Sequence, residues 1–275
     1  MNRSHQNEGR GRSRVLLSVR SLSVALSEGS GSKLLLKDVS FRLEDGEVFS
    51  IVGETGAGKS LLLSVLLGFL PESMEVCSGS IHFCGERIEY SKERIKRLRG
   101  EQIAYIPQNP GAALNPLFRL RHLAEDIFRN PNGWNREQRE AYYRRVFAGV
   151  GLGGEDLLSR YAFQLSGGMQ QRFMIGLALL NRPKLILADE PTSALDLPIQ
   201  AQIVGLLKKI QKERGVSVLF VTHDLPLAAV ISDRILVLRS GRVLRVGTPE
   251  ELFASPVDPY VSRLVAAAKE RMTAF

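Results

Sequence analysis

The stretch Gly53-Glu54-Thr55-Gly56-Ala57-Gly58-Lys59-Ser60 decides the fold of this chain of 275 residues. It matches the pattern G-x-x-x-x-G-K-[ST] at every fixed position. The apolar run Val48–Val52 precedes it, and a helical pattern begins at Lys59 and stops before Pro71. Glycines let consecutive backbone N–H groups converge on an anion, and the start of a helix adds partial positive charge. The stretch therefore predicts a phosphate-binding loop between a buried strand and a helix.

The side chains of this loop suggest separate roles. We expect Lys59 to reach the outer phosphates of a nucleoside triphosphate and the hydroxyl of Ser60 to ligate Mg²⁺. Nucleotide contacts are expected from the whole stretch 53–60 and from Leu61. A glycine-rich turn before an ordinary helix is the alternative interpretation, and the loop alone indicates only a nucleoside triphosphate.

A pair of carboxylates, Asp189 and Glu190, follows the apolar run 185–188. In a parallel sheet, ligands bind beyond the carboxyl ends of the strands, so both side chains are expected beside the loop at 53–60. Asp189 suits a Mg²⁺ contact through water, and Glu190 suits orienting and polarising an attacking water. Taken alone, an Asp-Glu pair after a strand is more often a cap or a turn.

Apolar runs of strand length alternate with segments of helical length, which is typical of a mostly parallel sheet covered by helices. From residue 109 to 161 the pattern is helical without a convincing strand, so we expect a helical lobe inserted into an α/β core. Helix starts are predicted at Asn135 and Thr248, each with a capping partner three residues later. The predicted strands are 15–26, 39–43, 48–52, 80–83, 102–106, 185–188, 216–221, 235–238 and 243–246, and the later helices are 199–213 and 225–231.

Composition narrows the class of protein. The net charge of +8 suits a phosphate-rich partner or an anionic surface but says nothing about the fold. Cys77 and Cys84 are the only cysteines, too few for a disulfide framework, which fits a reducing cytosol. The most apolar stretch, 61–70, is about half of the ~20 residues needed to cross a bilayer. Residues 1–14 are predicted to form a disordered basic tail, and no export signal is expected.

Between the loop and the acidic pair lies Leu165-Ser166-Gly167-Gly168-Met169-Gln170-Gln171-Arg172, which resembles the signature of the ATP-binding-cassette (ABC) ATPases. The other marks of that family follow in order: Gln108 stands where the family has its Q-loop, residues 193–196 resemble the D-loop, and His223 resembles the switch histidine. The resemblance extends from about Val15 to Gly247.

The resemblance implies an α/β fold with a P-loop NTPase (RecA-like) core, a small antiparallel β subdomain and an inserted α-helical subdomain at about 109–170. It divides the chain into a tail at 1–14, an ATPase domain at 15–248 and a helical extension at 249–275. It also implies that the chain binds ATP with Mg²⁺ and works as a dimer, either with itself or with a paralogous ATPase subunit.

Residue roles follow from the same resemblance. Ser166 is a good N-cap, and Gly167 and Gly168 free the first N–H groups of a helix that runs to about Leu180. In the family this helix end closes on the ATP that the partner's loop holds. Gln108 is then expected to touch Mg²⁺ or the attacking water. The other expected contacts are those of His223 with the γ-phosphate and of Asp196 with the partner subunit.

The segment 108–116, Met169 and the pair Pro259-Tyr260 look like the ATPase subunits of oligopeptide, dipeptide and nickel importers. Many peptide members carry a C-terminal cysteine cluster for an iron–sulfur centre, but no cysteine follows Cys84 here. This departure favours the nickel or metallophore branch.

Leu26 is a second departure, because the family usually has an aromatic residue there to stack on adenine. We expect Leu26 to cover the ring and ATP binding to weaken by about tenfold at most.

The partners implied are two transmembrane permease subunits and, indirectly, an extracytoplasmic solute-binding protein, with segment 109–122 gripping the permease. The expected location is the cytoplasmic face of the inner membrane, as a peripheral protein. An ATPase acting on nucleic acid is the first alternative, but the sequence lacks interleaved basic and aromatic residues, so no nucleic acid is expected. An exporter motor is the second, and the absence of fused membrane spans disfavours it.

Overall fold

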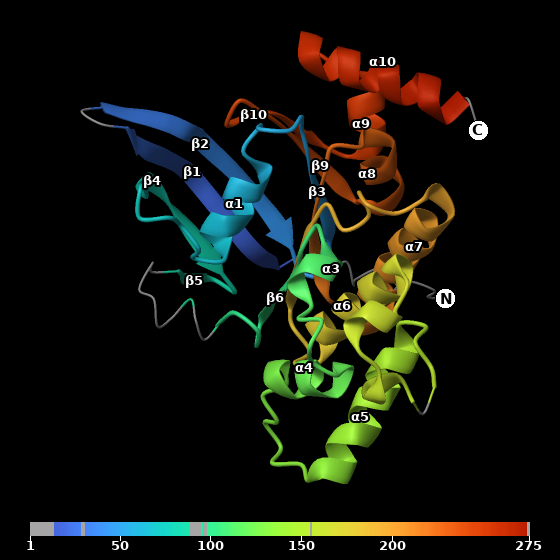
Figure 1. Cartoon of the computed structure of the whole chain (residues 1–275). Coiled ribbons are helices and arrows are strands. Elements are labelled where there is room, and N and C mark those ends of the chain that lie inside the picture. Colours follow the sequence, from blue (N-terminus) through green and yellow to red (C-terminus); the bar gives the residue numbers. More distant parts are fainter. Residues whose placement is uncertain (1–13, 29–30, 89–94, 96–97, 155, 274–275) are drawn as a thin grey trace, which may run out of the picture.

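The computed structural model describes residues 14–28, 31–88, 95, 98–154 and 156–273. The predicted basic tail at 1–14 lies outside this part of the chain, apart from its last residue. Two sheets and a helical lobe make up the molecule, with the lobe at the lower end of the view and helix α10 at the upper end (Figure 1).

The smaller sheet is antiparallel, with the strand order β2-β1-β4-β5. Its inner face is apolar: Leu17, Val19 and Leu22 of β1 are at most 1% exposed and join a core cluster with Leu62 and Leu63 of α1. Because alternate residues of a strand point to opposite faces, the outer face is left polar. The strands are β1 (Val15–Glu28), β2 (Gly31–Glu44), β4 (Met74–Phe83) and β5 (Glu86–Arg87), and α1 is Lys59–Leu66.

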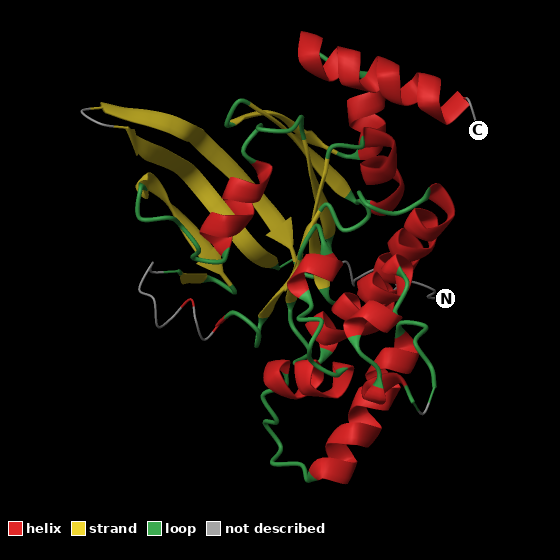
Figure 2. Ribbon diagram, viewed as in Figure 1, coloured by secondary structure: helices red, strands yellow, loops and turns green. Residues whose placement is uncertain are grey.

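The larger sheet has the order β10-β9-β3-β8-β7-β6, and all its strands are parallel except β10. Every residue of β3, β7 and β8 is buried, as expected for central strands with helices on both faces (Figure 2). The strands are β3 (Val48–Val52), β6 (Ile103–Ile106), β7 (Leu185–Asp189), β8 (Ser217–Thr222), β9 (Arg234–Arg239) and β10 (Arg242–Gly247).

Helices fill the middle of the chain and its end. The lobe contains α3 (Pro110–Ala113), α4 (Leu120–Ile127), α5 (Arg136–Gly149) and α6 (Gly167–Leu179), with two short 3₁₀ turns between α5 and α6. After it come α7 (Leu197–Arg214), α8 (Leu225–Ile231), α9 (Pro249–Ala254) and α10 (Pro259–Thr273). Among the described residues, no helix combines the length and the apolar character that a membrane span requires.

The predicted fold class is confirmed, and the differences lie at strand ends. The capping boxes at Asn135 and Thr248 are both present, and α8 has the predicted bounds. The strand predicted at 39–43 begins at Gly31, and the one predicted at 80–83 begins at Met74. The added residues of β2 are mostly exposed and carry no alternation of apolar and polar residues. The added start of β4 alternates only from Met74 to Cys77, which is a short signal for a strand.

Stability of the lobe depends on stacked aromatic rings. The rings of Phe147 and Phe173 are stacked with centroids 4.6 Å apart, and both side chains are 0% exposed.

Phe147→Ala leaves a cavity at this point, so we expect it to lower the free energy of unfolding by about 3–5 kcal/mol, measured by urea denaturation. The matched control is Phe163→Ala, because Phe163 is 68% exposed; its expected cost is below about 1 kcal/mol. Equal costs for the two variants would contradict this account of the lobe.

Candidate functional site

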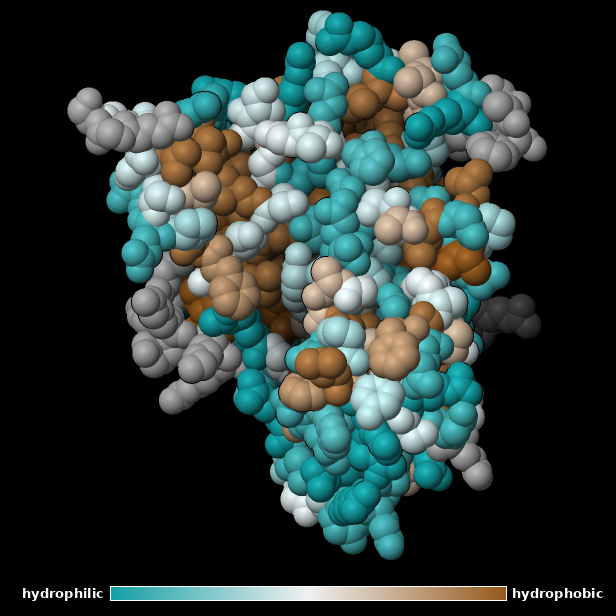
Figure 3. Space-filling view, in the orientation of Figure 1, coloured by the Kyte–Doolittle hydropathy of each residue, from teal (hydrophilic) through white to brown (hydrophobic). Residues whose placement is uncertain are grey.

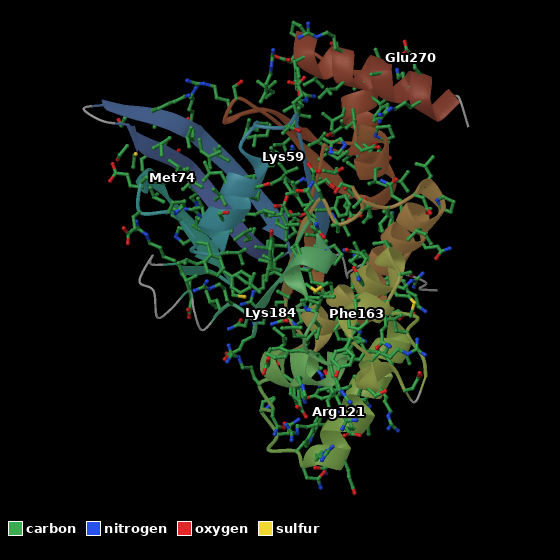
Figure 4. All side chains as sticks on the ribbon, viewed as in Figure 1. Lys59, Met74, Arg121, Phe163, Lys184 and Glu270 are labelled. Carbon is green, nitrogen blue, oxygen red and sulfur yellow. The ribbon has the colours of Figure 1, made fainter. Side chains whose placement is uncertain are left out.

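The loop at 53–60 forms a tight cradle between β3 and α1. Gly56 and Gly58 have φ angles of 83° and 107°, which side-chain-bearing residues rarely adopt. A Cβ on Gly53 would lie 2.3 Å from the carbonyl oxygen of Leu238, so glycine is required where the loop passes β9. The exposed backbone of 54–56 at the start of a helix suits phosphate groups. Figure 4 shows Lys59 at the beginning of α1, and its side chain is 5% exposed.

The ammonium of Lys59 is held inside the cradle. Its Nζ donates to the carbonyl oxygens of Gly53 at 2.7 Å and Glu54 at 3.0 Å. The same atom lies 3.7 Å from Oε1 of Glu190. The cradle therefore brings a buried positive charge beside the acidic pair, as predicted from the parallel sheet.

Asp189, at the carboxyl end of β7, meets hydroxyl groups from two other elements. The Ser60 hydroxyl donates to its Oδ1 at 3.3 Å and the Tyr105 hydroxyl to its Oδ2 at 3.4 Å. Burial raises the pKa of Asp189 above its ordinary value, although the hydrogen bond from Ser60 opposes that shift. Burial also raises the pKa of Tyr105 to about 12, assisted by the charge of Asp189. A carboxylate beside a hydroxyl is an oxygen pair of the kind that Mg²⁺ prefers.

The side chain of Glu190 contacts two other residues that were predicted for the site. Its Oε2 lies 3.1 Å from Nδ1 of His223 and accepts a hydrogen bond of 3.2 Å from Nε2 of Gln108. Its backbone has a φ of 42°, and its N–H donates to the carbonyl oxygen of Val221 at 2.9 Å. The side chain is 14% exposed, so its carboxylate is partly open to water. Three predicted residues, from the segments that follow β6, β7 and β8, thus converge on one point.

The predicted signature, residues 165–172, lies at the start of α6 in the helical lobe and not at the cradle. Ser166 caps α6, with its Oγ accepting a hydrogen bond of 3.4 Å from the N–H of Met169. Asp196 caps α7, accepting from the N–H of Ile199 at 3.0 Å, and a Cβ on Gly168 would lie 2.9 Å from Cγ2 of the same Ile199. Figure 4 places Phe163, just before the signature, well apart from Lys59. The chain therefore has an exposed helix start that does not close its own cradle.

Leu26 lies near the end of β1, in the antiparallel sheet. It pairs with Lys33 of β2 and Met74 of β4, and its side chain is half-buried. The half-buried side chain leaves an apolar surface, and contact between this surface and adenine stays a prediction.

Sequence reasoning did not assign Tyr105 to the site, and it placed Ser193 in the predicted D-loop at 193–196 without predicting its contacts. The Ser193 hydroxyl accepts from Nε2 of Gln108 at 3.3 Å and donates to the carbonyl oxygen of Glu190 at 3.1 Å. A signal existed for each residue. Tyr105 has a polar tip at the carboxyl end of a predicted strand, and Ser193 stands three residues after Glu190.

The chain is similar to known ATP-binding transport proteins. A family model described as ABC transporter matches residues 36–193. The glutathione import ATP-binding protein GsiA of Salmonella typhi is 38% identical over 271 residues, covering 94% of this chain and 43% of that relative. The peptidoglycan transport ATP-binding protein YejF of Agrobacterium fabrum is 39% identical over 255 residues, covering 92% and 47%. The chain thus spans less than half the length of these relatives.

Solved structures with the same fold include complete cassettes. The ATP-binding cassette MJ0796, in a dimeric post-hydrolysis state bound to ADP and Pi, matches 85% of this chain with a TM-score of 0.72 and 28% identity, over 99% of its own length. The structure of cbiO1 from Clostridium perfringens, part of the ABC transporter complex cbiONQ, matches 94% of this chain with a TM-score of 0.76 and 28% identity, over 97% of its own length.

The raised pKa of Asp189 has a consequence for stability. Because its folded-state pKa lies above the unfolded value, the stability it contributes is full at low pH and is lost as the pH rises through the folded pKa. Above the folded pKa the buried carboxylate is ionised, and its burial is then destabilising. We expect Asp189→Asn, whose amide oxygen can accept from one of the two hydroxyls while its NH₂ donates to the other, to raise the free energy of unfolding at pH 7, measured by urea denaturation.

The control for this variant is Asp196→Asn, because Asp196 is exposed and Asn is an equally good N-cap. Its expected effect lies within about 0.5 kcal/mol of zero. A loss of stability in Asp189→Asn at pH 7 would contradict the interpretation that burial of the ionised Asp189 side chain is destabilising.

Proposed function

The chain belongs to the ABC transporter family, and we propose on that premise that it hydrolyses ATP to drive the import of a solute across a membrane. The observation that carries the proposal is the convergence on Glu190 of Gln108 and His223, with Lys59 3.7 Å away. In this arrangement the carboxylate, its two positioning partners and the buried ammonium face the same point at the edge of the sheet.

Binding of the nucleotide is assigned to the cradle. The backbone N–H groups of 53–60 and the ammonium of Lys59 would hold the phosphates, and Leu61 would extend this contact into α1. Ser60 and Asp189 would hold Mg²⁺, with Gln108 at the side of the ion. When bound, Mg²⁺ neutralises charge on the phosphate oxygens. Leu26 would cover the adenine.

Hydrolysis is assigned to Glu190, whose partly open carboxylate would accept a hydrogen bond from the attacking water and orient it. His223 and Gln108 hold this carboxylate from two sides, and His223 would also contact the γ-phosphate. Fixed charges and dipoles in a site that excludes water contribute most of the stabilisation in phosphoryl transfer. The role of the chain is thus positioning and electrostatics.

A second subunit would complete the site. The signature residues Ser166 and Gly167, which are exposed, and the half-buried Gly168 would close on the nucleotide held by the partner. Asp196 would bridge to that partner. The dimeric state of MJ0796 supports this arrangement. The partner is either a second copy of this chain or a paralogous ATPase subunit.

An apolar groove supports a permease as the further partner. It runs between the end of α1, β6 and α6, and its exposed apolar members are Phe69, Ile127 and Tyr105, with 59%, 43% and 39% of their surface exposed. Figure 3 shows apolar residues gathering on the side of the molecule that carries α1. The segment 109–122 adds Leu117, which is 80% exposed. We assign this surface to a pair of transmembrane permease subunits.

The class of solute is proposed from the names of the relatives. GsiA is a glutathione import protein and YejF a peptidoglycan transport protein, so a peptide or a peptide-containing molecule is the first candidate. Nickel or a metallophore complex is the second candidate, because the segment 108–116 and the pair Pro259-Tyr260 resemble the ATPase subunits of nickel importers as well as those of peptide importers. A solute-binding protein outside the membrane would deliver either solute, with this chain on the cytoplasmic face of the inner membrane as a peripheral subunit.

Removing the carboxylate of Glu190 tests the assignment of hydrolysis. We expect Glu190→Gln to lower ATP turnover by about 100-fold or more, because a neutral amide cannot polarise water as a carboxylate does. ATP-dependent dimerisation, followed by analytical ultracentrifugation, should persist. In cells that lack the native gene, uptake of peptides and of nickel should be restored by the wild-type chain and not by the variant.

Turnover near the wild-type rate would remove Glu190 from its assigned role. If cells that lack the gene take up both solutes normally, while the purified wild-type chain hydrolyses ATP, the proposed solutes are wrong and the assignment of hydrolysis is unaffected.

The assignment of the signature is tested by Ser166→Arg. A guanidinium at this exposed helix start would obstruct the approach of a second subunit. We therefore expect ATP-dependent dimerisation to be lost, while ATP binding to the single chain stays within about twofold of the wild-type affinity, since Ser166 lies outside the chain's own cradle. Dimers that form normally with ATP would show that Ser166 is not at the subunit contact.

A further inference from the structure

Strand β6 is the outermost strand of the larger sheet, on the side of the helical lobe (Figure 1). Its residues Ile103 and Ile106 are at most 3% exposed, but Tyr105 between them is 39% exposed. In the register of the parallel pair, Tyr105 stands beside Leu187 of β7. Because alternate residues of a strand share a face, Tyr105 lies on the same face of the sheet as Asp189, two residues after Leu187.

The polar end of Tyr105 reaches the carboxylate at the end of β7. Its hydroxyl donates to Oδ2 of Asp189 at 3.4 Å, and the hydroxyl of Ser60 donates to Oδ1 at 3.3 Å. A phenol keeps its proton at neutral pH, so Tyr105 is the donor and the carboxylate is the acceptor. The two oxygens of Asp189 are thus contacted by hydroxyl groups from β6 and from α1.

The ring of the same side chain lines the apolar groove between the end of α1, β6 and α6. This groove has a volume of about 560 Å³, and Phe69 and Met174 line it together with Tyr105. The guanidinium of Arg99 lies over the ring of Phe69, 3.9 Å from its centroid, which supports one wall of the groove. Tyr105 is therefore accessible from the groove while its hydroxyl contacts Asp189.

The orientation of a carboxylate decides how well it holds Mg²⁺. The ion requires near-ideal octahedral geometry, and the terminal torsion of an Asp side chain has a broad energy minimum. Hydrogen bonds to a ligating carboxylate fix its orientation, and their loss lowers the affinity for the metal. Tyr105 supplies such a bond to the oxygen of Asp189 that Ser60 does not contact.

We propose that Tyr105 links the permease groove to the Mg²⁺ site: its hydroxyl positions Asp189 for the ion, and its ring is part of the surface that the permease covers. This inference rests on the proposed roles of Asp189 and of the groove. A permease segment that covers the ring would remove it from water and restrict its movement, so the carboxylate would be held more firmly when the groove is occupied. Tyr105 is a positioning residue, because it acts on the ion through Asp189.

The role of the hydroxyl is tested by Tyr105→Phe in the full chain, which keeps the ring. Binding of ADP, which the chain does not hydrolyse, is measured by isothermal titration calorimetry in Mg²⁺ and in EDTA. We expect the Kd in Mg²⁺ to rise by about 3- to 10-fold, because one hydrogen bond to a ligating carboxylate is lost, and the Kd in EDTA to stay within about twofold. A merely structural role would lower the melting temperature and change neither Kd, or change both by the same factor.

The matched control is Tyr142→Phe, because the Tyr142 hydroxyl donates to the carbonyl oxygen of Leu180 at 2.8 Å, within the helical lobe. It should lower the melting temperature, measured by circular dichroism, and leave both Kd values unchanged. In a background of Asp189→Asn, Tyr105→Phe should change the Kd in Mg²⁺ by less than about twofold, because the two residues act as one unit.

The role of the ring is tested by Tyr105→Ala, which removes the ring as well as the hydroxyl. The tagged chain is purified from solubilised membranes of its own host, and the permease subunits recovered with it are quantified by mass spectrometry. Tyr105→Phe should retain the permease, and Tyr105→Ala should lower its recovery by about fivefold or more, because the apolar contact is lost. Phe69→Ala should lower this recovery in the same way and leave both Kd values for ADP within about twofold.

Two outcomes would overturn the inference: a Kd in Mg²⁺ for Tyr105→Phe equal to that of the wild-type chain, or full recovery of the permease with Tyr105→Ala. Two other variants separate this failure from failure of the proposed function. If Asp189→Asn binds ADP in Mg²⁺ as tightly as the wild-type chain, the assignment of the Mg²⁺ site is wrong. If Phe69→Ala retains the permease, the assignment of the groove is wrong. If both of these variants behave as expected and the Tyr105 variants do not, only the inference about Tyr105 is wrong.

Discussion

The parallel pairing of β6, β7, β8 and β3 is the constraint on which the rest of the site depends. Each of these strands ends at the same edge of the sheet, and each is followed by one part of the site. Gln108 comes after β6, Glu190 after β7, His223 after β8 and the cradle after β3. Residues separated by more than a hundred positions meet there because the strands share one direction, and helices on both faces keep the strands buried.

One chain contains only part of the nucleotide site, because the signature does not lie at this edge of the sheet. The signature begins α6 in the helical lobe, and the hydroxyl of Ser166 accepts its hydrogen bond from the first turn of that helix. The α6 start therefore presents free N–H groups and an exposed Ser166 to a neighbour, as the cradle presents its open side. Two such surfaces on opposite parts of one chain suit a pair of subunits in which each supplies what the other lacks. The nucleotide would then bind between the two subunits and contact both. Its binding energy would draw the subunits together, and this movement would be passed on to the permease.

Much of this arrangement was predictable because it is carried by local patterns. The strand before the cradle is a run of apolar residues, the capping boxes at Asn135 and Thr248 mark helix starts, and the acidic pair stands at a strand end. The extent of the antiparallel sheet was not, because the outer part of β2 is mostly exposed without alternation and that of β4 alternates only from Met74 to Cys77. The position of Tyr105 near a strand end made it a candidate, but its contact with Asp189 depends on tertiary packing, which the sequence pattern does not show.

The most direct test of the account is the rate of ATP hydrolysis per subunit over a dilution series of the purified chain, with the fraction of dimer measured by analytical ultracentrifugation at each concentration. A composite site requires that the rate per subunit fall in proportion to the fraction of dimer, toward zero where only monomers remain. A rate per subunit that stays constant into the strictly monomeric range would contradict it, because one chain would then hold a complete site.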